Sequence, residues 1–397
     1  MISILYSHQL RALPFAAGNF VPGAANYSYN IVADRLRTAL RYAGLSVHDV
    51  DFPGVYTTEL AINNLKQRIA PQDRFCHMAV KPLDHIELMR GVPNVIYYAW
   101  EFDRLTAQRT NNDPRTNQLL LLRQFDKIMV PCTFQHDVFQ TSGLTQTVVV
   151  PIPVPIGNDS DALTSALKLN AFDFRNRENI LLDMHSLNQL YKGRIFLSVF
   201  NPLDPRKNFR NILMAAASID THAVFIFKFT LDPNKTSTAW IIKRFGIDGV
   251  RVGKALIYFI PSYISEHDMH RLMQTANFAL SASTAEGQNL PLLEGMAHGQ
   301  IPVAPRHTAM LDYIDSDTSC VIASRPVKAP ARTSYLGEAD LRMHISNSED
   351  ISSAINNALS LSDTAVGFRS KACQSLVSRR YSTEAVAYSI RSLFGSM

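Results

Sequence analysis

Short, mostly apolar segments alternate along the chain with longer segments whose apolar residues recur at helical spacing. Residues 2–6, 75–80, 195–200 and 256–260 are examples of the short segments. Apolar strands of this kind are typical of sheets buried on both faces, and their alternation with helices is typical of parallel sheets with helical crossovers. The pattern therefore predicts an α/β protein with parallel sheets.

The alternation is interrupted once, by the sequence VPIPVPIGNDSDA, which crowds three prolines, a glycine and polar turn formers together. This composition predicts a linker near residues 150–165. A chain of 397 residues has room for two domains. We expect an amino-terminal Rossmann-like domain over residues 1–165, a second over 166–378, and a carboxyl-terminal helix over 379–397 that packs on either domain.

Composition excludes several other classes. Hydrophobic residues make up 46% of the chain and charged residues 18%, so a disordered chain is excluded. The net charge of +5 is spread along the sequence and does not indicate a nucleic-acid partner. The four cysteines have no metal or redox spacing, and no eighteen apolar residues occur in succession. We therefore expect a cytoplasmic protein without a membrane span.

Residues 276–314 contain the clearest local pattern, reading as strand, polar loop and short helix. Pro291 suits the first turn of this helix, Gly299 suits the position after its end, and Asn289 or Leu290 is placed as the N-cap. The helix begins just past the carboxyl end of a strand, where parallel sheets bind ligands and free backbone N–H groups favour a phosphate. The stretch therefore predicts an anion site.

Two carboxylates flank this predicted site. Glu286 lies in the loop before the helix, and Glu294 lies one turn inside it. One can reach a sugar and the other a ribose while the N–H groups hold phosphates between them. Solvated or capping carboxylates are the structural alternative.

A basic pair marks the corresponding turn of an earlier strand. Arg206 and Lys207 fall between an apolar strand and a helix. A cation at this turn can neutralise the charge that grows on a departing diphosphate. A basic pair at a helix start is more often a solvated feature, and its combination with the Glu286 segment favours the catalytic interpretation.

These stretches resemble a known family. EGQNLPLLE, from Glu286 to Glu294, is similar to the Glu-x7-Glu motif of the retaining glycosyltransferases of family 4, which have the two-domain GT-B fold. DPRKN resembles the lysine-bearing turn of that family, and PVAPRHTAMLDYI resembles the segment after its motif. The resemblance implies a nucleotide-sugar donor and no metal or other cofactor. It places Glu286 at the donor sugar, Glu294 at the ribose and Lys207 at the diphosphate. The other predicted donor-binding residues are Gly23, Asn201, Arg206, Gly287, Asn289 and Leu290.

The chain departs from the family pattern at four places, one of which is Asn289, where relatives often have a second glycine. Phe200 and Asn201 stand where the family has Gly-Arg, so the arginine contact to phosphate is either absent or supplied by Arg206. Gly23 is followed by two alanines where relatives have a Gly-Gly loop. Relatives carry a histidine after the fourth strand, whereas this chain reads AWEFD, and we expect Glu101 in the cleft, either as a catalytic group or as a structural carboxylate.

Other polar features are less informative. The acidic pairs Asp159/Asp161 and Asp315/Asp317 resemble metal-binding Asp-x-Asp, but their positions indicate turns. The histidines show no metal-ligand spacing, so we expect no metal site. Three arginines on a predicted helix over residues 27–43 indicate a solvated face or, alternatively, weak contact with an anionic membrane surface; they are Arg35, Arg37 and Arg41.

The sequence as a whole favours a retaining, metal-independent hexosyltransferase. It would move a sugar from a nucleotide-sugar donor to a glycan or lipid-linked acceptor, in bacterial surface polysaccharide synthesis, in the cytoplasm or peripherally at the inner membrane face. Two alternatives stay open. One is a sugar-nucleotide epimerase or phosphorylase on the same fold, and the other is a non-catalytic scaffold that binds nucleotide sugars.

Overall fold

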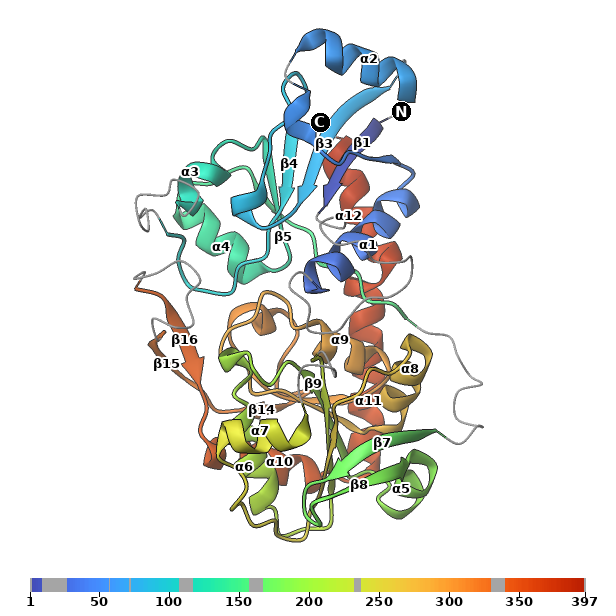
Figure 1. Ribbon diagram of the computed structural model, residues 1–397, viewed down its shortest axis with the longest axis vertical. Helices are drawn as coiled ribbons and strands as arrows, with labels where there is room; N and C mark the ends of the chain where they lie inside the picture. Colours follow the sequence, from blue (N-terminus) through green and yellow to red (C-terminus); the bar gives the residue numbers. More distant parts are fainter. Residues whose placement is uncertain are drawn as a thin grey trace.

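The computed structural model describes residues 2–8, 27–56, 58–70, 73–106, 117–156, 167–231, 237–329 and 340–395. These residues form two α/β bodies, one above the other along the long axis of the molecule (Figure 1). Gly23, the Asp159/Asp161 pair and most of the predicted linker lie outside the described residues.

The amino-terminal body contains a six-stranded sheet with the order β2-β1-β3-β4-β5-β6. Every neighbouring pair is parallel. The strands are β1 (Ile2–His8), β2 (Ser46–Asp49), β3 (Arg74–Val80), β4 (Asn94–Tyr97), β5 (Lys127–Val130) and β6 (Thr147–Val149). The helices are α1 (Tyr27–Tyr42), α2 (Glu59–Ile69), α3 (Gln118–Leu122) and α4 (Thr133–Thr141), with short 3-10 turns η1 (Pro53–Val55) and η2 (Leu83–His85).

The second body contains an eight-stranded sheet with the order β14-β13-β12-β9-β10-β11-β7-β8. Its strands are β7 (Lys168–Asp173), β8 (Glu178–Asp183), β9 (Ile195–Phe200), β10 (Val224–Phe229), β11 (Leu256–Ile260), β12 (Phe278–Leu280), β13 (Ile301–Pro305) and β14 (Cys320–Ile322). The six strands from β14 to β11 are parallel, as predicted. An antiparallel hairpin of β7 and β8 extends the edge beside β11.

Helices cover both faces of this second sheet. They are α5 (Met184–Leu190), α6 (Phe209–Ser218), α7 (Thr238–Phe245), α8 (Glu266–Thr275), α9 (Leu290–Ala297) and α10 (Ser348–Leu359), with the 3-10 turns η6 (Pro205–Lys207) and η7 (Thr308–Asp312). A separate antiparallel ribbon is formed by β15 (Arg325–Lys328) and β16 (Arg342–Ile345).

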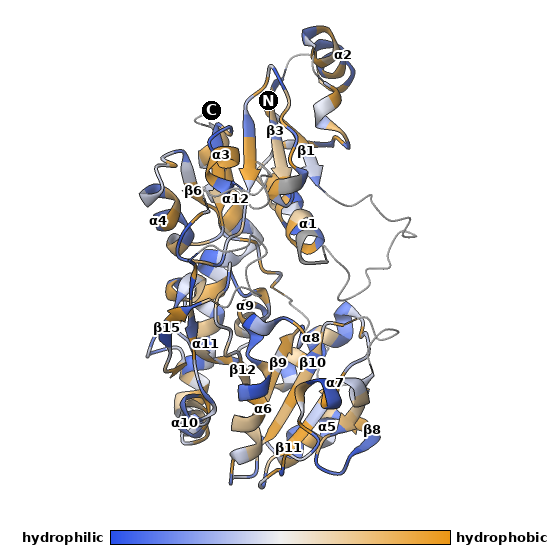
Figure 2. Cartoon of the chain, turned by 60° about the vertical axis from the view of Figure 1, so that its left-hand side comes forward, coloured by the Kyte–Doolittle hydropathy of each residue, from blue (hydrophilic) through white to orange (hydrophobic). Residues whose placement is uncertain are grey.

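The centre of the second sheet is apolar on both faces because helices cover both. Every residue of β10 is buried, and the central strands are coloured as hydrophobic in Figure 2. On one face, Phe225 stacks on Phe196 with ring centroids 4.8 Å apart, and Phe196 stacks in turn on Phe278 at 4.7 Å. Aromatic side chains bury large areas, so this row supplies much of the hydrophobic core.

The last two helices join the two bodies. α11 (Asp363–Tyr381) packs on α9 in the second body, and α12 (Thr383–Gly395) packs on α1 in the first, as Figure 1 shows in red. The inner face of α12 buries Ile390 and Phe394 in the core that also holds Leu36 and Leu40 of α1. α12 therefore packs on the body that contains β1, and the predicted boundary at residue 378 lies within α11.

Two expectations from the sequence concerned the cysteines, which have no metal or redox spacing, and the absence of a membrane span. All four cysteines are buried free thiols. Within the described ranges, no helix is both long and apolar enough to cross a bilayer.

Candidate active site

The loops at the carboxyl ends of the two sheets meet between the bodies. Ile152, which follows β6, exchanges two hydrogen bonds with the Gln288 side chain: its N–H donates to Oε1 at 2.7 Å, and its carbonyl accepts from Nε2 at 2.8 Å. The N–H of Thr133, after β5, donates to Asp312 Oδ2 at 2.9 Å. Ligands of parallel sheets bind at the carboxyl ends of strands, so this junction is the expected site.

The amino end of α9 faces this junction. Asn289, its N-cap residue, has left-handed backbone angles (φ 60°, ψ 63°) and its side chain makes no capping hydrogen bond. Instead, Asn289 Nδ2 donates to Ser281 Oγ at 3.1 Å, so the side chain fixes the loop rather than the helix. Pro291 has no N–H, and the Leu292 N–H donates to the Asn289 carbonyl at 3.1 Å, so the first-turn N–H that α9 can offer to an anion is that of Leu290.

Lys207 and Glu286 form an ion pair beside this helix end. η6 ends at Lys207, and Asp204 caps η6 by accepting from the Arg206 N–H at 3.0 Å. Glu286 is 6% exposed. Its N–H donates to Thr308 Oγ1 at 3.2 Å, which holds the loop against η7. The two residues that the sequence placed at the diphosphate and at the donor sugar therefore contact each other.

Arg206 connects the two bodies. Its guanidinium lies 2.8 Å from Asp204 Oδ2 in its own loop and 2.7 Å from Glu101 Oε1, which comes from the loop after β4. Burial opposes the positive charge, but Glu101, Asp204 and Glu286 outweigh burial and hold the pKa of Arg206 well above its ordinary value. Glu101 thus lies between the bodies, against a cation of the second one.

Glu294, one turn inside α9, pairs with Arg35 of α1. This contact corrects the expectation of an exposed basic face on α1. Arg37 also has a partner, Asp49 at 2.8 Å, and the side chains of Arg35 and Arg37 are 19% and 17% exposed. Successive helical residues turn by about 100°, so Arg35 and Arg37 point to nearly opposite sides. Arg41 alone of the three is exposed.

Three further predicted donor-binding residues shape the loops. Asn201 Oδ1 accepts from the Leu203 N–H at 2.9 Å and so fixes the turn after β9. Gly287 lies so close to the first body that a Cβ there would meet Ala99 Cβ and Gln135 Nε2, each at 3.4 Å. Leu290 starts α9 and packs, partly buried, against the cores of both bodies.

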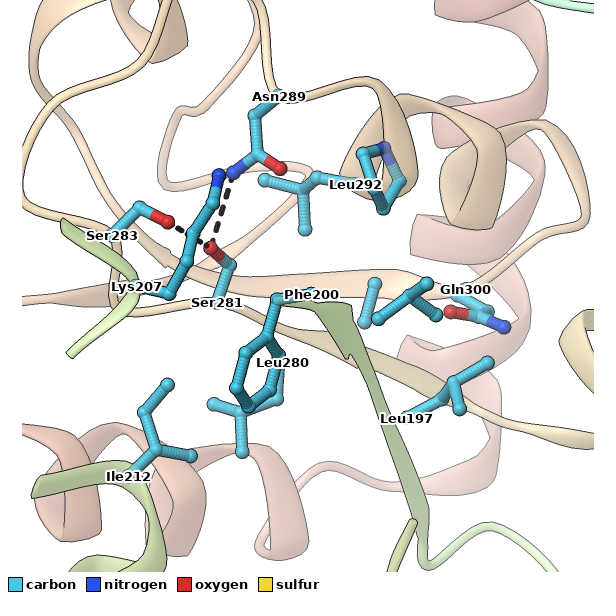
Figure 3. Close-up of a pocket in the computed structure, with 13 residues that line it drawn as sticks. Leu197, Phe200, Lys207, Ile212, Leu280, Ser281, Ser283, Asn289, Leu292 and Gln300 are labelled. Carbon is cyan, nitrogen blue, oxygen red and sulfur yellow. Dashed lines mark hydrogen bonds between the residues drawn. The ribbon is translucent and has the colours of Figure 1, made fainter. Parts of the chain in front are cut away.

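A pocket lies below the amino end of α9 (Figure 3). The polar ends of Lys207, Ser281 and Asn289 gather on one side of it, and Ser281 Oγ donates to Ser283 Oγ at 3.3 Å. The remaining lining residues are mainly apolar and come from β9, α6, β12 and α9; they include Leu197, Val199, Phe200, Ile212, Leu280, Pro291 and Leu292. Cationic and hydroxyl groups beside an apolar wall suit a ligand with an anionic part and a less polar part.

Sequence reasoning missed His307, although it lies in the stretch that resembles the family. The ring is 2% exposed and stacks on His344 with centroids 4.5 Å apart. Burial, followed by the neighbouring His344, lowers the pKa of His307 to about 3. A neutral ring therefore supports the segment next to Thr308, whose φ is 48°. The stacking on His344 of β16 is a tertiary contact, so the structural role of His307 could not be read from the sequence.

No family model matches the sequence. No curated protein matches it either. Solved structures do match the fold. Trehalose-6-phosphate synthase from E. coli, bound with UDP-2-fluoro glucose, has a TM-score of 0.59 and 12% sequence identity, over 99% of this chain and 98% of that one. The chain has the GT-B fold.

Two other GT-B structures cover the chain almost completely. HepE from Anabaena, in complex with UDP and glucose, has a TM-score of 0.55 and 14% identity over 100% of both chains. WaaG, a glycosyltransferase involved in lipopolysaccharide biosynthesis, has a TM-score of 0.53 and 13% identity over 99% of both. The predicted GT-B fold with two Rossmann-like bodies is therefore confirmed.

Proposed function

We propose that this protein is a glycosyltransferase that moves a sugar from a nucleotide-sugar donor to a glycan or lipid-linked acceptor. One observation carries the proposal: Lys207 and Arg206 lie with Glu286 beside the amino end of α9, where the loops of both bodies meet. A donor supplies a diphosphate for the cations and the helix end. The GT-B neighbours crystallised with UDP support this class of ligand.

The residues take distinct roles in this proposal. The diphosphate meets Lys207, Arg206 and the Leu290 N–H at the start of α9, which stabilise the charge that grows on the leaving group. Glu294 accepts from the ribose hydroxyls. Glu286 contacts the donor sugar, and its pairing with Lys207 compensates the charge of this buried carboxylate.

We further propose that transfer retains the anomeric configuration by front-face departure and attack. The bond between the sugar and the diphosphate breaks as the sugar acquires oxocarbenium character. The acceptor hydroxyl attacks from the side on which the diphosphate leaves and passes its proton to the departing phosphate oxygen. Glu101 comes from the acceptor body, and its Oε1 lies 2.7 Å from the Arg206 guanidinium. In this scheme Glu101 contacts the acceptor directly or acts on the leaving group through Arg206. No covalent glycosyl-enzyme is needed in this scheme.

The acceptor and location are also proposals. The fold shared with WaaG supports an acceptor in surface polysaccharide synthesis. We propose that the protein works in the cytoplasm and touches the inner membrane face weakly. Because Arg35 and Arg37 have ion-pair partners, Arg41 is the exposed arginine of α1 that can take part in such contact.

Binding and product analysis test the proposed activity. Nucleoside diphosphates should raise the melting temperature, because a ligand that binds only the folded state stabilises it. Incubation of the matching nucleotide sugar with candidate acceptors should yield a glycoside with the donor's anomeric configuration by NMR. Isomerised donor formed without acceptor would instead support an epimerase, and binding without any turnover would support a scaffold.

Chelation tests the metal-independent part of the proposal. We expect transfer to continue in excess EDTA, because Lys207, Arg206 and the α9 amino end balance the diphosphate charge. Loss of activity in EDTA, with recovery on adding Mn²⁺ or Mg²⁺, would contradict this scheme. The glycosyl transfer itself would still stand in that case.

A further inference from the structure

Lys228 is a buried cation at the ligand edge of the second sheet that the proposed mechanism does not use. The residue is 4% exposed. Its Nζ donates to the carbonyl oxygen of Phe229, the last residue of β10, at 2.6 Å. The neighbours in register are Val199 on β9 and Ile260 on β11, both apolar. The ammonium therefore lies level with the carboxyl end of the strand, between hydrocarbon side chains.

In this environment not all N–H donors of the ammonium have an acceptor. A protonated lysine has three N–H donors, and one hydrogen bond is made here. Across the described ranges, no carboxylate lies within ion-pair distance of Lys228. Burial lowers the pKa of Lys228 to about 8. A buried donor without an acceptor is destabilising, and such groups in native proteins call for an explanation. A ligand that supplies the missing acceptor would explain why this lysine is buried here.

Lys228 lies on the face of the second sheet that α8 covers, and this face also borders the pocket below α9. Side chains alternate across a strand, so Lys228 shares a face with Val224 and Ile226, which pack in the core under α8. Val199 belongs to the same face and lines the pocket together with Pro291 and Leu292 of α9. Neighbouring strands are about 4.8 Å apart, so Lys228 on β10 lies one strand away from Val199, which lines the pocket from β9.

The order of groups along this face matches the order of parts in a nucleotide. Arg206 and Lys207 follow β9 at the amino end of α9, and Glu294 lies one turn into α9. Diphosphate and ribose occupy these positions in the proposed function. The base then extends over β9 toward β10, where Lys228 lies.

We infer that Lys228 recognises the donor base, by donating from Nζ to a ring carbonyl oxygen. This inference rests on the proposed function and narrows its donor. An ammonium only donates, so it suits uracil or guanine, which carry carbonyl oxygens. Adenine has no carbonyl oxygen; its acceptors are ring nitrogens, and its exocyclic amino group only donates, so where uracil or guanine presents a carbonyl oxygen adenine would meet the ammonium with a donor. The donor is accordingly a sugar on an oxo base.

Calorimetric titration of UDP, GDP and ADP at pH 7 tests the inference. The wild-type protein should bind UDP or GDP about 10–100-fold more tightly than ADP, the range expected for one hydrogen bond from a charged donor. Lys228→Met should reduce this preference to less than about threefold and leave the ADP affinity unchanged, because methionine keeps the length and removes the donor. Lys243→Met, at an exposed residue of α7, is the matched control and should keep the wild-type preference.

The outcomes separate the base contact from the proposed function. If Lys228→Met keeps the wild-type preference, or if the wild type prefers ADP, Lys228 does not recognise the base and the glycosyltransferase proposal stands. If the wild type binds none of the three nucleotides, the proposed function fails and this inference fails with it.

A second measurement needs no variant. Between about pH 6.5 and 8.5 the ratio of the ADP to the UDP dissociation constant should fall, because Lys228 loses its proton near pH 8. The phosphate ionisations are common to both nucleotides and cancel in the ratio. A ratio that rises over this range would overturn the inference even if Lys228→Met failed to fold.

Discussion

At the scale of single residues, the pairing of Lys207 with Glu286 changes what a substitution is expected to do. From sequence, Lys207 is a loop cation whose removal affects turnover far more than folding. In the structure its side chain is 19% exposed, and that of Glu286 is 7% exposed. Removing one partner of a buried pair leaves the other charge uncompensated, which is strongly destabilising.

We therefore expect Lys207→Ala to lower both turnover and stability. Turnover should fall about 10²–10³-fold, because a cation that meets growing negative charge is lost. The melting temperature should fall too, because Glu286 is left unpaired. Steady-state kinetics and thermal unfolding measure the two effects.

The double variant Lys207→Ala/Glu286→Gln separates the two roles. It removes the unpaired charge, so it should recover the melting temperature and stay inactive. Wild-type turnover in Lys207→Ala would remove this lysine from the mechanism, and an unchanged melting temperature would show that the pair contributes little to stability.

At the scale of elements, α9 depends on a residue in an unusual backbone conformation. Asn289 has φ 60°, a region that residues with a Cβ occupy at a cost; the cost is small for asparagine, and glycine, which has no Cβ, does not pay it. Its hydrogen bond to Ser281 at 3.1 Å adds to the preference for asparagine. The start of the helix, and with it the direction of the Leu290 N–H, therefore depends on this position.

Asn289→Ala should destabilise the protein by about 1–2 kcal/mol, the cost of a left-handed alanine. Asn289→Gly loses the same hydrogen bond without that cost, so its free energy of unfolding should lie closer to that of the wild type. Urea unfolding of the three proteins measures the difference. Equal stabilities of the alanine and glycine variants would show that backbone strain at Asn289 does not matter.

At the scale of the whole molecule, ion pairs join the bodies on both sides of the site. Arg35 of the first body holds Glu294 of the second, and Glu101 of the first holds Arg206 of the second. The groups proposed to bind the donor are thus tied to the acceptor body. Donor affinity should accordingly depend on residues of the other body.

A double-mutant cycle on Arg35→Met and Glu294→Gln measures this dependence. The two changes should be non-additive by about 1 kcal/mol or more in nucleoside diphosphate binding, because contacting charged residues couple by about 0.5–3 kcal/mol. Arg41→Met, at an exposed position of the same helix, is the control and should show no coupling with Glu294→Gln. Additive effects of the first pair would contradict the link between the bodies.

The acid stability of the whole protein should depend on His77. This ring is fully buried, and Ser7 Oγ and Asn94 Oδ1 lie 2.8 Å from its two nitrogens. Because Asn94 Nδ2 donates to the carbonyls of Met89 and Val92, its Oδ1 accepts from the His77 Nδ1–H. The Nε2 atom then accepts from Ser7, so the ring is neutral, and burial lowers its pKa to about 4.

The unfolded chain protonates this histidine near pH 6.5, whereas the folded protein does so near pH 4. Between these values the unfolded state binds more protons, so stability falls as pH falls, by about 3 kcal/mol from this group. Urea unfolding at pH 7, 6 and 5 measures the slope. His77→Gln cannot titrate and should lose less stability over the range; parallel curves for the two proteins would contradict the assignment.

Local spacing alone was enough for several features of this protein. Glu286, Asn289 and Glu294 fall within nine consecutive residues, and the cap, the proline and the strand before them fix the start of α9 through contacts between near neighbours. Continuous apolar runs located β9 and β11 with their observed bounds. The sequence did not predict α11, because few of its residues are buried and its apolar pattern is correspondingly weak.

The tertiary structure decided which charges meet. Lys207 and Glu286 are 79 residues apart in sequence, and Arg35 and Glu294 are 259 apart. Spacing along one helix suggested a basic face for Arg35, but the packing of α1 beside α9 gives it a carboxylate partner. Burial of Lys228 likewise follows from the strands on either side of β10. Local geometry is set by neighbours in sequence, whereas the partner of a charge is set by chain segments that only folding brings together.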